Sequence, residues 1–127
     1  MTIRILYVDD EADIRDIAAM SLELDTDFEV RTASSGIEAL PIAAEWKPHI
    51  ILLDVMMPVM DGPTCFARLR EHPDSRDIPV VFITARTQAQ EVEGFKALGA
   101  EGVIGKPFDP MSLAPTVRAY LDPARAG

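Results

Sequence analysis

The stretch His49-Ile50-Ile51-Leu52-Leu53-Asp54 is apolar over four consecutive residues and then ends in an acid. A strand that is apolar on both faces is expected in the centre of a parallel sheet, where helices cover each side. Parallel strands are joined by crossover connections, which usually contain a helix. The stretch therefore predicts an α/β fold in which this strand is central and Asp54 lies at its carboxyl end.

Strand-like and helix-like segments alternate on both sides of this stretch. Short apolar, β-branched segments predict four more strands, at residues 3–8, 28–33, 79–83 and 102–104. Helical periodicity and turn residues predict helices over about residues 36–45, 63–71, 89–98 and after 109, preceded by a first helix with Ile14, Ile17, Ala18, Ser21 and Leu24 on one face. This order predicts a single doubly wound sheet of five parallel strands with helices on both faces.

Several residues indicate where helices begin or bend. Ser35 and Glu38 have the spacing of a capping box, in which Ser35 caps a helix and Glu38 reaches back. Asp109 is predicted to cap the last helix. Pro41 and Pro115 fall inside predicted helices, where each removes one hydrogen bond and is expected to bend the helix.

Length and composition bound the fold and the partners. The 127 residues predict one domain over residues 1–122, followed by a frayed tail over 123–127. The formal net charge of −9 repels phosphates, so we expect no direct contact with nucleic acid. Neither a signal segment nor a bilayer-spanning apolar run is evident, which predicts a cytoplasmic protein without membrane contact. Cys65, the single cysteine, is predicted to be buried and unreactive.

Polar side chains follow the predicted strands at their carboxyl ends: Asp9 and Asp10, Asp54, Thr84 and Lys106. In open α/β sheets these ends meet at one edge, where ligands bind. Three neighbouring carboxylates repel one another, and a hard cation such as Mg²⁺ relieves that repulsion. An aspartate can also act as a nucleophile toward phosphorus. Each residue alone has a structural explanation, such as helix capping, but the set together predicts Mg²⁺-dependent phosphoryl chemistry.

These motifs resemble the receiver domain of bacterial two-component response regulators. The matching stretches span nearly the whole chain: residues 5–11, 51–58, 61–62, 83–85, 99–100 and 106–108. The resemblance implies a flavodoxin-like sheet with strand order 2-1-3-4-5, as in the chemotaxis response regulator, a member that consists of a receiver alone. We expect this chain to be stand-alone too, although an excised receiver would look the same.

The resemblance also implies the residues that hold Mg²⁺. Asp10 and Asp54 are expected to be direct ligands, and Asp9 is expected to act largely through water. The backbone carbonyl of Met56 would complete the protein ligation, so the side chain at that position is free to vary.

The phosphoryl group is expected on Asp54. The resemblance implies that Thr84 supplies the switch hydroxyl, that Lys106 pairs with the phosphoryl group, and that the Lys106–Pro107 bond is cis. The donor would be a phosphohistidine on a sensor histidine kinase or a histidine phosphotransfer protein, and the output would be binding to a downstream protein. We expect self-phosphorylation and self-dephosphorylation without multiple turnover, and a monomer or a phosphorylation-dependent dimer.

One position departs from the family pattern. Three residues before Lys106, where the family usually has Tyr or Phe, the chain has Val103. A small β-branched side chain has no ring to swing inward when Thr84 moves. We expect phosphorylation to survive this change, and we expect the signal to travel through the loop from Ala85 to Gln88.

Three alternatives stay open at this point. The first is a phosphate-independent receiver-like interaction module, which only Val103 favours. The second is a Mg²⁺ phosphohydrolase, which would usually carry a second Asp where this chain has Met56. The third is a flavodoxin, which the residues Asp9-Asp10-Glu11 disfavour because they offer no Ser/Thr/Gly-rich cradle for a flavin phosphate.

Overall fold

Strands and helices alternate along residues 2–121, which are the residues that this computed structural model describes. The elements are β1 (Ile3–Val8), α1 (Ala12–Leu22), β2 (Phe28–Ala33), α2 (Gly36–Trp46), β3 (Ile50–Asp54), α3 (Gly62–Glu71), β4 (Val80–Thr84), α4 (Ala89–Ala97), β5 (Gly102–Gly105) and α5 (Pro110–Leu121). All strand pairs are parallel, in the order β2-β1-β3-β4-β5, as predicted. The predicted end of the domain at residue 122 and the tail over 123–127 lie outside the described residues.

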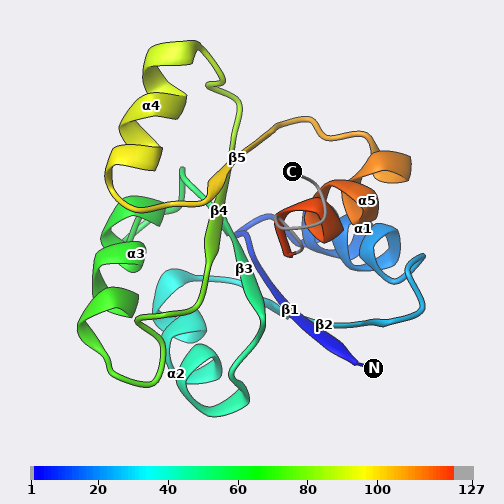
Figure 1. Cartoon of the computed structure of the whole chain (residues 1–127), viewed down its shortest axis with the longest axis horizontal. Coiled ribbons are helices and arrows are strands. Elements are labelled where there is room, and N and C mark those ends of the chain that lie inside the picture. The colour runs from blue at the N-terminus through cyan, green and yellow to red at the C-terminus, as the bar shows by residue number, and fades with distance from the viewer. Residues whose placement is uncertain (1, 122–127) are drawn as a thin grey trace.

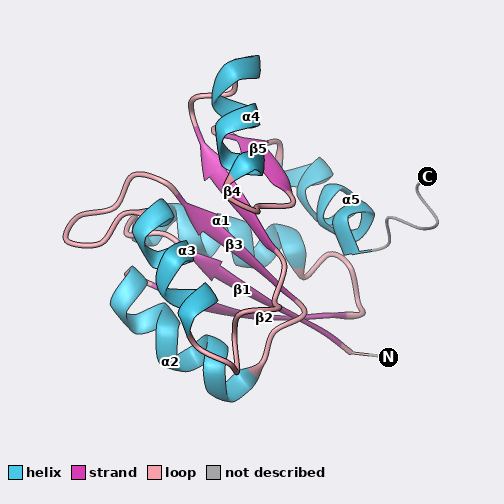
Figure 2. Cartoon of the chain, turned by 60° about the vertical axis from the view of Figure 1, so that its left-hand side comes forward, coloured by secondary structure: helices cyan, strands magenta, loops and turns pink. Residues whose placement is uncertain are grey.

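Helices cover both faces of the sheet. Figure 1 shows α1 and α5 on one side of the strands and α2, α3 and α4 on the other. In the turned view of Figure 2, the magenta strands lie between these two layers of cyan helices. None of the helices in the described part of the chain is long and apolar enough to cross a membrane.

The central strand β3 separates two hydrophobic layers. Its side chains alternate, so that Ile51 and Leu53 pack under α2 and α3 while Ile50 and Leu52 pack under α1 and α5. Every residue of β3 is buried, which explains why the strand is apolar on both faces.

The predicted apolar face of α1 is partly wrong. The helix ends at Leu22, and Leu24 lies in the following turn with 62% of its surface exposed. Ile17 is 44% exposed, and the residues that α1 buries are Ala18, Ser21 and Leu22. Two of these three residues are small, and α5 packs against the same helix. The hydroxyl of Ser21 is satisfied there by donating to the carbonyl of Ile17 at 2.6 Å.

The predicted caps are present, with one difference in partner. Ser35 Oγ accepts from the N–H of Glu38 at 3.1 Å, as a capping box requires. The Glu38 carboxylate, however, reaches back to the backbone and hydroxyl of Ser34, because Ser34 and not Ser35 turns its donors toward it. Asp109 Oδ1 accepts from the N–H of Met111 at 2.9 Å and so caps α5 as predicted.

The predicted positions of the two prolines and the predicted burial of Cys65 are confirmed. Pro41 and Pro115 lie inside α2 and α5. Cys65 is fully buried, and burial raises the pKa of its thiol to about 11, which keeps it protonated and unreactive.

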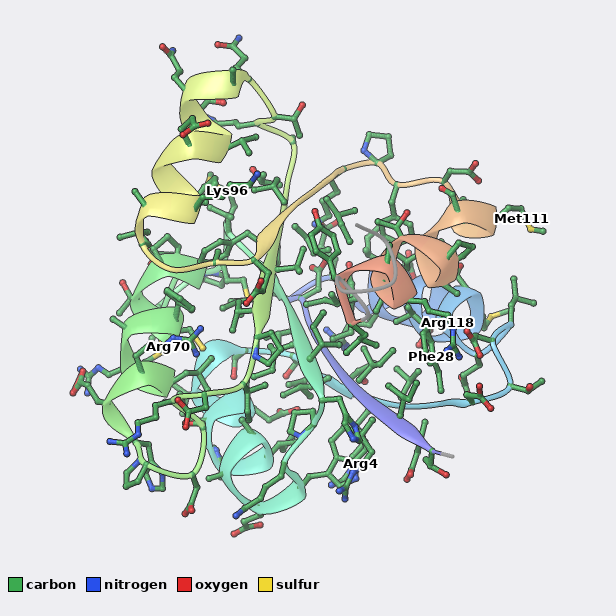
Figure 3. All side chains as sticks on the ribbon, viewed as in Figure 1. Arg4, Phe28, Arg70, Lys96, Met111 and Arg118 are labelled. Carbon is green, nitrogen blue, oxygen red and sulfur yellow. The ribbon has the colours of Figure 1, made fainter. Side chains whose placement is uncertain are left out.

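An ion-pair cluster ties the last helix to the first part of the chain. Arg118 of α5 donates to Asp25 at 2.7 Å and to Asp27 at 2.9 Å, both in the turn before β2. Its guanidinium also lies 5.3 Å from the ring centre of Phe28, and Figure 3 shows the two side chains close together. The hydrogen bond from Arg118 lowers the pKa of Asp25. These contacts hold α5 beside α1.

A glycine brings α3 close to the end of β3. A Cβ atom on Gly62 would lie 2.5 Å from the carbonyl oxygen of Asp54 and 2.8 Å from the Cα of Val55. The N–H of Gly62 donates to the carbonyl of Val55 at 2.9 Å. Only glycine allows this approach, which fixes the backbone that carries Asp54.

Candidate functional site

The carboxyl edge of the sheet gathers the polar residues that the sequence predicted. Asp9 directly follows β1, Asp54 is the last residue of β3, and Thr84 is the last residue of β4. Lys106 directly follows β5, and its N–H donates to the carbonyl of Thr84 at 2.9 Å. The parallel register therefore brings residues from four strands to one place.

Three carboxylates lie together at this edge. Asp9, Asp10 and Asp54 each present one carboxylate oxygen, and these atoms all lie within 4.8 Å of one another. Asp9 is 0% exposed and Asp54 is 2% exposed, whereas Asp10 is open to solvent. A set of hard oxygen donors with one open side fits Mg²⁺, which keeps several water ligands.

Lys106 provides the positive charge in the cluster. Its Nζ lies 3.0 Å from Asp9 Oδ2, 3.5 Å from Asp54 Oδ1 and 3.6 Å from Glu11 Oε1. Burial alone would lower the pKa of Lys106, but the hydrogen bond to Asp9 and the charge of Asp54 outweigh it and raise the pKa. The lysine is therefore a fixed cation beside Asp54.

The surroundings of Asp54 disfavour its ionised form. Burial, followed by repulsion from Asp9, raises the pKa of Asp54 from 3.8 to about 6, against the opposing effect of Lys106. Burial makes the ionised form of this carboxylate unfavourable. The carboxylate is therefore stabilised when a cation binds beside it or when a covalent bond changes its surroundings.

Asp9 is held by contacts that the sequence analysis did not foresee. Its Oδ1 accepts from the N–H of Glu11 at 2.9 Å, and its Oδ2 accepts from the hydroxyl of Tyr7 at 3.2 Å. Arg15 donates to its carbonyl oxygen at 2.8 Å. Tyr7 could have been found from its position, because residues two apart in a strand point to the same face. The contacts of Glu11 and Arg15 depend on the turn into α1, which has no comparable signal.

Thr84 lies at the buried end of β4. It is 3% exposed, and its Oγ1 accepts from the backbone N–H of Arg86 at 3.0 Å. The bond occupies a lone pair of Oγ1 and leaves the hydroxyl proton available to donate. The side chain of Met56, by contrast, is 73% exposed and makes no polar contribution to the site.

The segment around Lys106 agrees with one expectation. The Lys106–Pro107 peptide bond is cis, as predicted. Val103 is half-buried on the face that carries α4, where it packs against the hydrophobic layer that contains Phe82 and Phe95. Its carbonyl accepts from the hydroxyl of Tyr120 at 3.4 Å, which joins β5 to α5.

Comparison with known families and proteins gives a consistent result. The family described as "Response regulator receiver domain" matches residues 5–118. The DNA-binding dual master transcriptional regulator RpaA of Synechocystis is 39% identical over 119 residues, covering 93% of this chain and 48% of RpaA. The transcriptional regulatory protein SrrA of Staphylococcus aureus is 42% identical over 122 residues, covering 95% of this chain and 48% of SrrA. The chain thus spans about half the length of these curated relatives.

Solved structures confirm the predicted fold. The chemotaxis response regulator CheY4 of Vibrio cholerae superposes with a TM-score of 0.86 at 33% identity, covering 94% of this chain and 99% of CheY4. A response regulator from Desulfuromonas acetoxidans gives a TM-score of 0.83 at 27% identity, covering 94% and 97% of the two chains.

The raised pKa of Asp54 predicts a pH-dependent effect of Asp54→Asn on stability without metal. The fold favours the neutral carboxyl, so the native chain loses stability as the pH rises from about 4 through 6. Asparagine cannot ionise, so Asp54→Asn removes this pH-dependent loss of stability. We expect the variant to be more stable than the native chain at pH 8 by about 1 to 2 kcal/mol, because solvent at the open side of the site screens part of the effect, and we expect the difference to shrink toward pH 4.

Urea unfolding in EDTA at pH 4.5 and pH 8 measures this difference, with Asp16→Asn on the exposed side of α1 as the control. Equal stability of Asp54→Asn and the native chain at pH 8 would show that the fold tolerates the ionised Asp54.

Proposed function

The chain belongs to the response regulator receiver domain family, and from this membership we propose that it is a signalling switch that accepts a phosphoryl group on Asp54. The observation that carries the proposal is the buried Asp54 carboxylate, which lies among two further acids with the ammonium group of Lys106 at 3.5 Å. Nucleophile, cation ligands and a charge partner for phosphate are thus together at one edge of the sheet.

We propose that Mg²⁺ binds to Asp9, Asp10 and Asp54, with the backbone carbonyl of Met56 as the remaining protein ligand. Asp10 and Asp54 act as direct ligands and Asp9 acts largely through water. When bound, the cation neutralises negative charge on the carboxylates and on the incoming phosphoryl oxygens. The cluster fits this role because its donors are all carboxylate oxygens and one of them, Asp10, faces solvent.

The transfer itself uses groups of this chain. An oxygen of Asp54 attacks the phosphorus of a phosphohistidine, an O–P bond forms as the N–P bond breaks, and the imidazole nitrogen keeps the released electron pair. Lys106 moves its hydrogen bonds from the carboxylates to the new phosphoryl oxygens, because these carry the larger charge. The hydroxyl of Thr84 donates to a phosphoryl oxygen, which shifts Thr84 and the loop that follows it.

The proposed partners follow from this chemistry. The donor is a sensor histidine kinase or a histidine phosphotransfer protein, and the output is a changed affinity for a downstream protein. The chain is a switch and not a multiple-turnover enzyme, in keeping with its family. RpaA binds DNA according to its name, but this chain matches only half of RpaA, and we expect no direct contact of these residues with nucleic acid.

A phosphate-independent interaction module is the second candidate. The observation that favours it is the residue at position 103. Val103 is half-buried and has no aromatic ring that could turn inward when Thr84 moves. Asp9, Asp10, Asp54, Thr84 and Lys106 are all present, however, and a module without phosphate chemistry has no need for this set.

Intact mass spectrometry tests the phosphoacceptor directly. The chain is incubated with acetyl phosphate in Mg²⁺ or in EDTA, and compared with Asp54→Ala and with Asp16→Ala as a control on the exposed side of α1. We expect one phosphoryl adduct on the native chain and on Asp16→Ala, only with Mg²⁺, and none on Asp54→Ala. A folded native chain that takes up no phosphoryl group would favour the phosphate-independent module.

The proposed output route predicts where the structure changes. Because Val103 has no ring, we propose that the signal passes through the loop from Ala85 to Gln88, which follows Thr84 and is exposed. Crystal structures of the free and beryllofluoride-bound chain should differ in this loop while Val103 keeps its rotamer and neighbours. A loop that stays fixed while Val103 moves would contradict this route.

A further inference from the structure

A tyrosine lies beneath the acidic cluster. Tyr7 belongs to β1, is 0% exposed, and points to the same side of the sheet as Asp9 two residues later. Its hydroxyl donates to Asp9 Oδ2 at 3.2 Å. Phenylalanine would fill the same space without bringing a polar atom into the core, so the hydroxyl needs an explanation beyond packing.

The oxygen that Tyr7 contacts is the one that Lys106 also contacts. Asp9 Oδ2 accepts from Tyr7 at 3.2 Å and lies 3.0 Å from the ammonium group of Lys106, while Oδ1 accepts from the N–H of Glu11. Asp9 is 0% exposed, so few water molecules are available to replace a donor that leaves. A buried carboxylate oxygen without any donor is strongly unfavourable.

The ring of Tyr7 extends these contacts to the segment that carries Lys106. It packs edge-on against Phe108, with ring centres 6.5 Å apart and an angle of 72° between the planes. Phe108 is two residues after Lys106, on the far side of the Lys106–Pro107 bond. Tyr7 therefore contacts Asp9, which is an ion-pair partner of Lys106, and Phe108, which belongs to the same segment as Lys106.

We infer that Tyr7 is a positioning residue for phosphoryl transfer: its hydroxyl holds Asp9 in place and keeps Oδ2 bonded when Lys106 turns to the phosphoryl group. This inference rests on the proposed function. Without the hydroxyl, Lys106 would be the one remaining side-chain donor to Oδ2 among the described residues. Asp9 would then be less well oriented toward the cation, and releasing Lys106 would be less favourable.

Magnesium binding by the full chain tests this inference without any phosphoryl group. Isothermal titration with MgCl₂ compares the native chain with Tyr7→Phe, which keeps the ring and its contact with Phe108. We expect the dissociation constant to rise about tenfold, as is usual when a partner that orients a metal-binding carboxylate is lost. Tyr120→Phe is the matched control, because its hydroxyl bonds to Val103, away from the acids.

A double-mutant cycle separates positioning from packing. In an Asp9→Ala background, Tyr7→Phe should cause no further change in the dissociation constant, because the side chain that accepts from Tyr7 is gone. The same tenfold loss in that background would show a general structural effect and overturn the inference. So would an unchanged dissociation constant for Tyr7→Phe alone.

The outcomes also distinguish this inference from the proposed function. If the native chain binds Mg²⁺ and takes up a phosphoryl group, and Tyr7→Phe binds Mg²⁺ equally well, only the role of Tyr7 is overturned. If the native chain neither binds Mg²⁺ nor takes up a phosphoryl group, the proposed function is overturned, and the role of Tyr7 is overturned with it.

Discussion

The ion pairs of Lys106 with Asp9 and Asp54 hold together a cluster of carboxylates that would otherwise repel one another. Two of these acids are almost fully buried, and burial penalises their charge. The lysine offsets part of this penalty, but the raised pKa of Asp54 shows that the compensation is incomplete. We expect a site in this condition to respond strongly to a divalent cation or to a new phosphoryl group, and the proposed switch rests on that sensitivity.

The fold serves this cluster by bringing distant residues to one edge of the sheet. Parallel strands deliver Asp9, Asp54, Thr84 and Lys106 from four different parts of the chain. Two hydrophobic layers keep the sheet rigid beneath them, and the close approach of Gly62 fixes the backbone at Asp54. Small movements of Lys106 or Thr84 therefore occur against a fixed frame, and the proposed output route passes from Thr84 into the loop from Ala85 to Gln88.

The sequence predicted the parts of this structure that follow from a regular period. The apolar run before Asp54 identified the central strand, and the strand ends identified the five polar residues of the site. The exposure of Ile17 and Leu24 was not predictable, because it depends on where α1 ends and on how closely α5 approaches it. The bond from Glu38 to Ser34 and the contact of Glu11 with Lys106 depend on local turn geometry, which a pattern of residue types does not contain.

The proposed switch depends most on Asp54 being the residue that carries the phosphoryl group. Borohydride reduces an acyl phosphate of aspartate to homoserine, so treatment after reaction with acetyl phosphate and Mg²⁺ marks the acceptor permanently. Peptide mapping by tandem mass spectrometry then reads its position. We expect homoserine at position 54 and unmodified Asp9 and Asp10. Homoserine at either of those two acids, or at none of the three, would contradict the proposed switch.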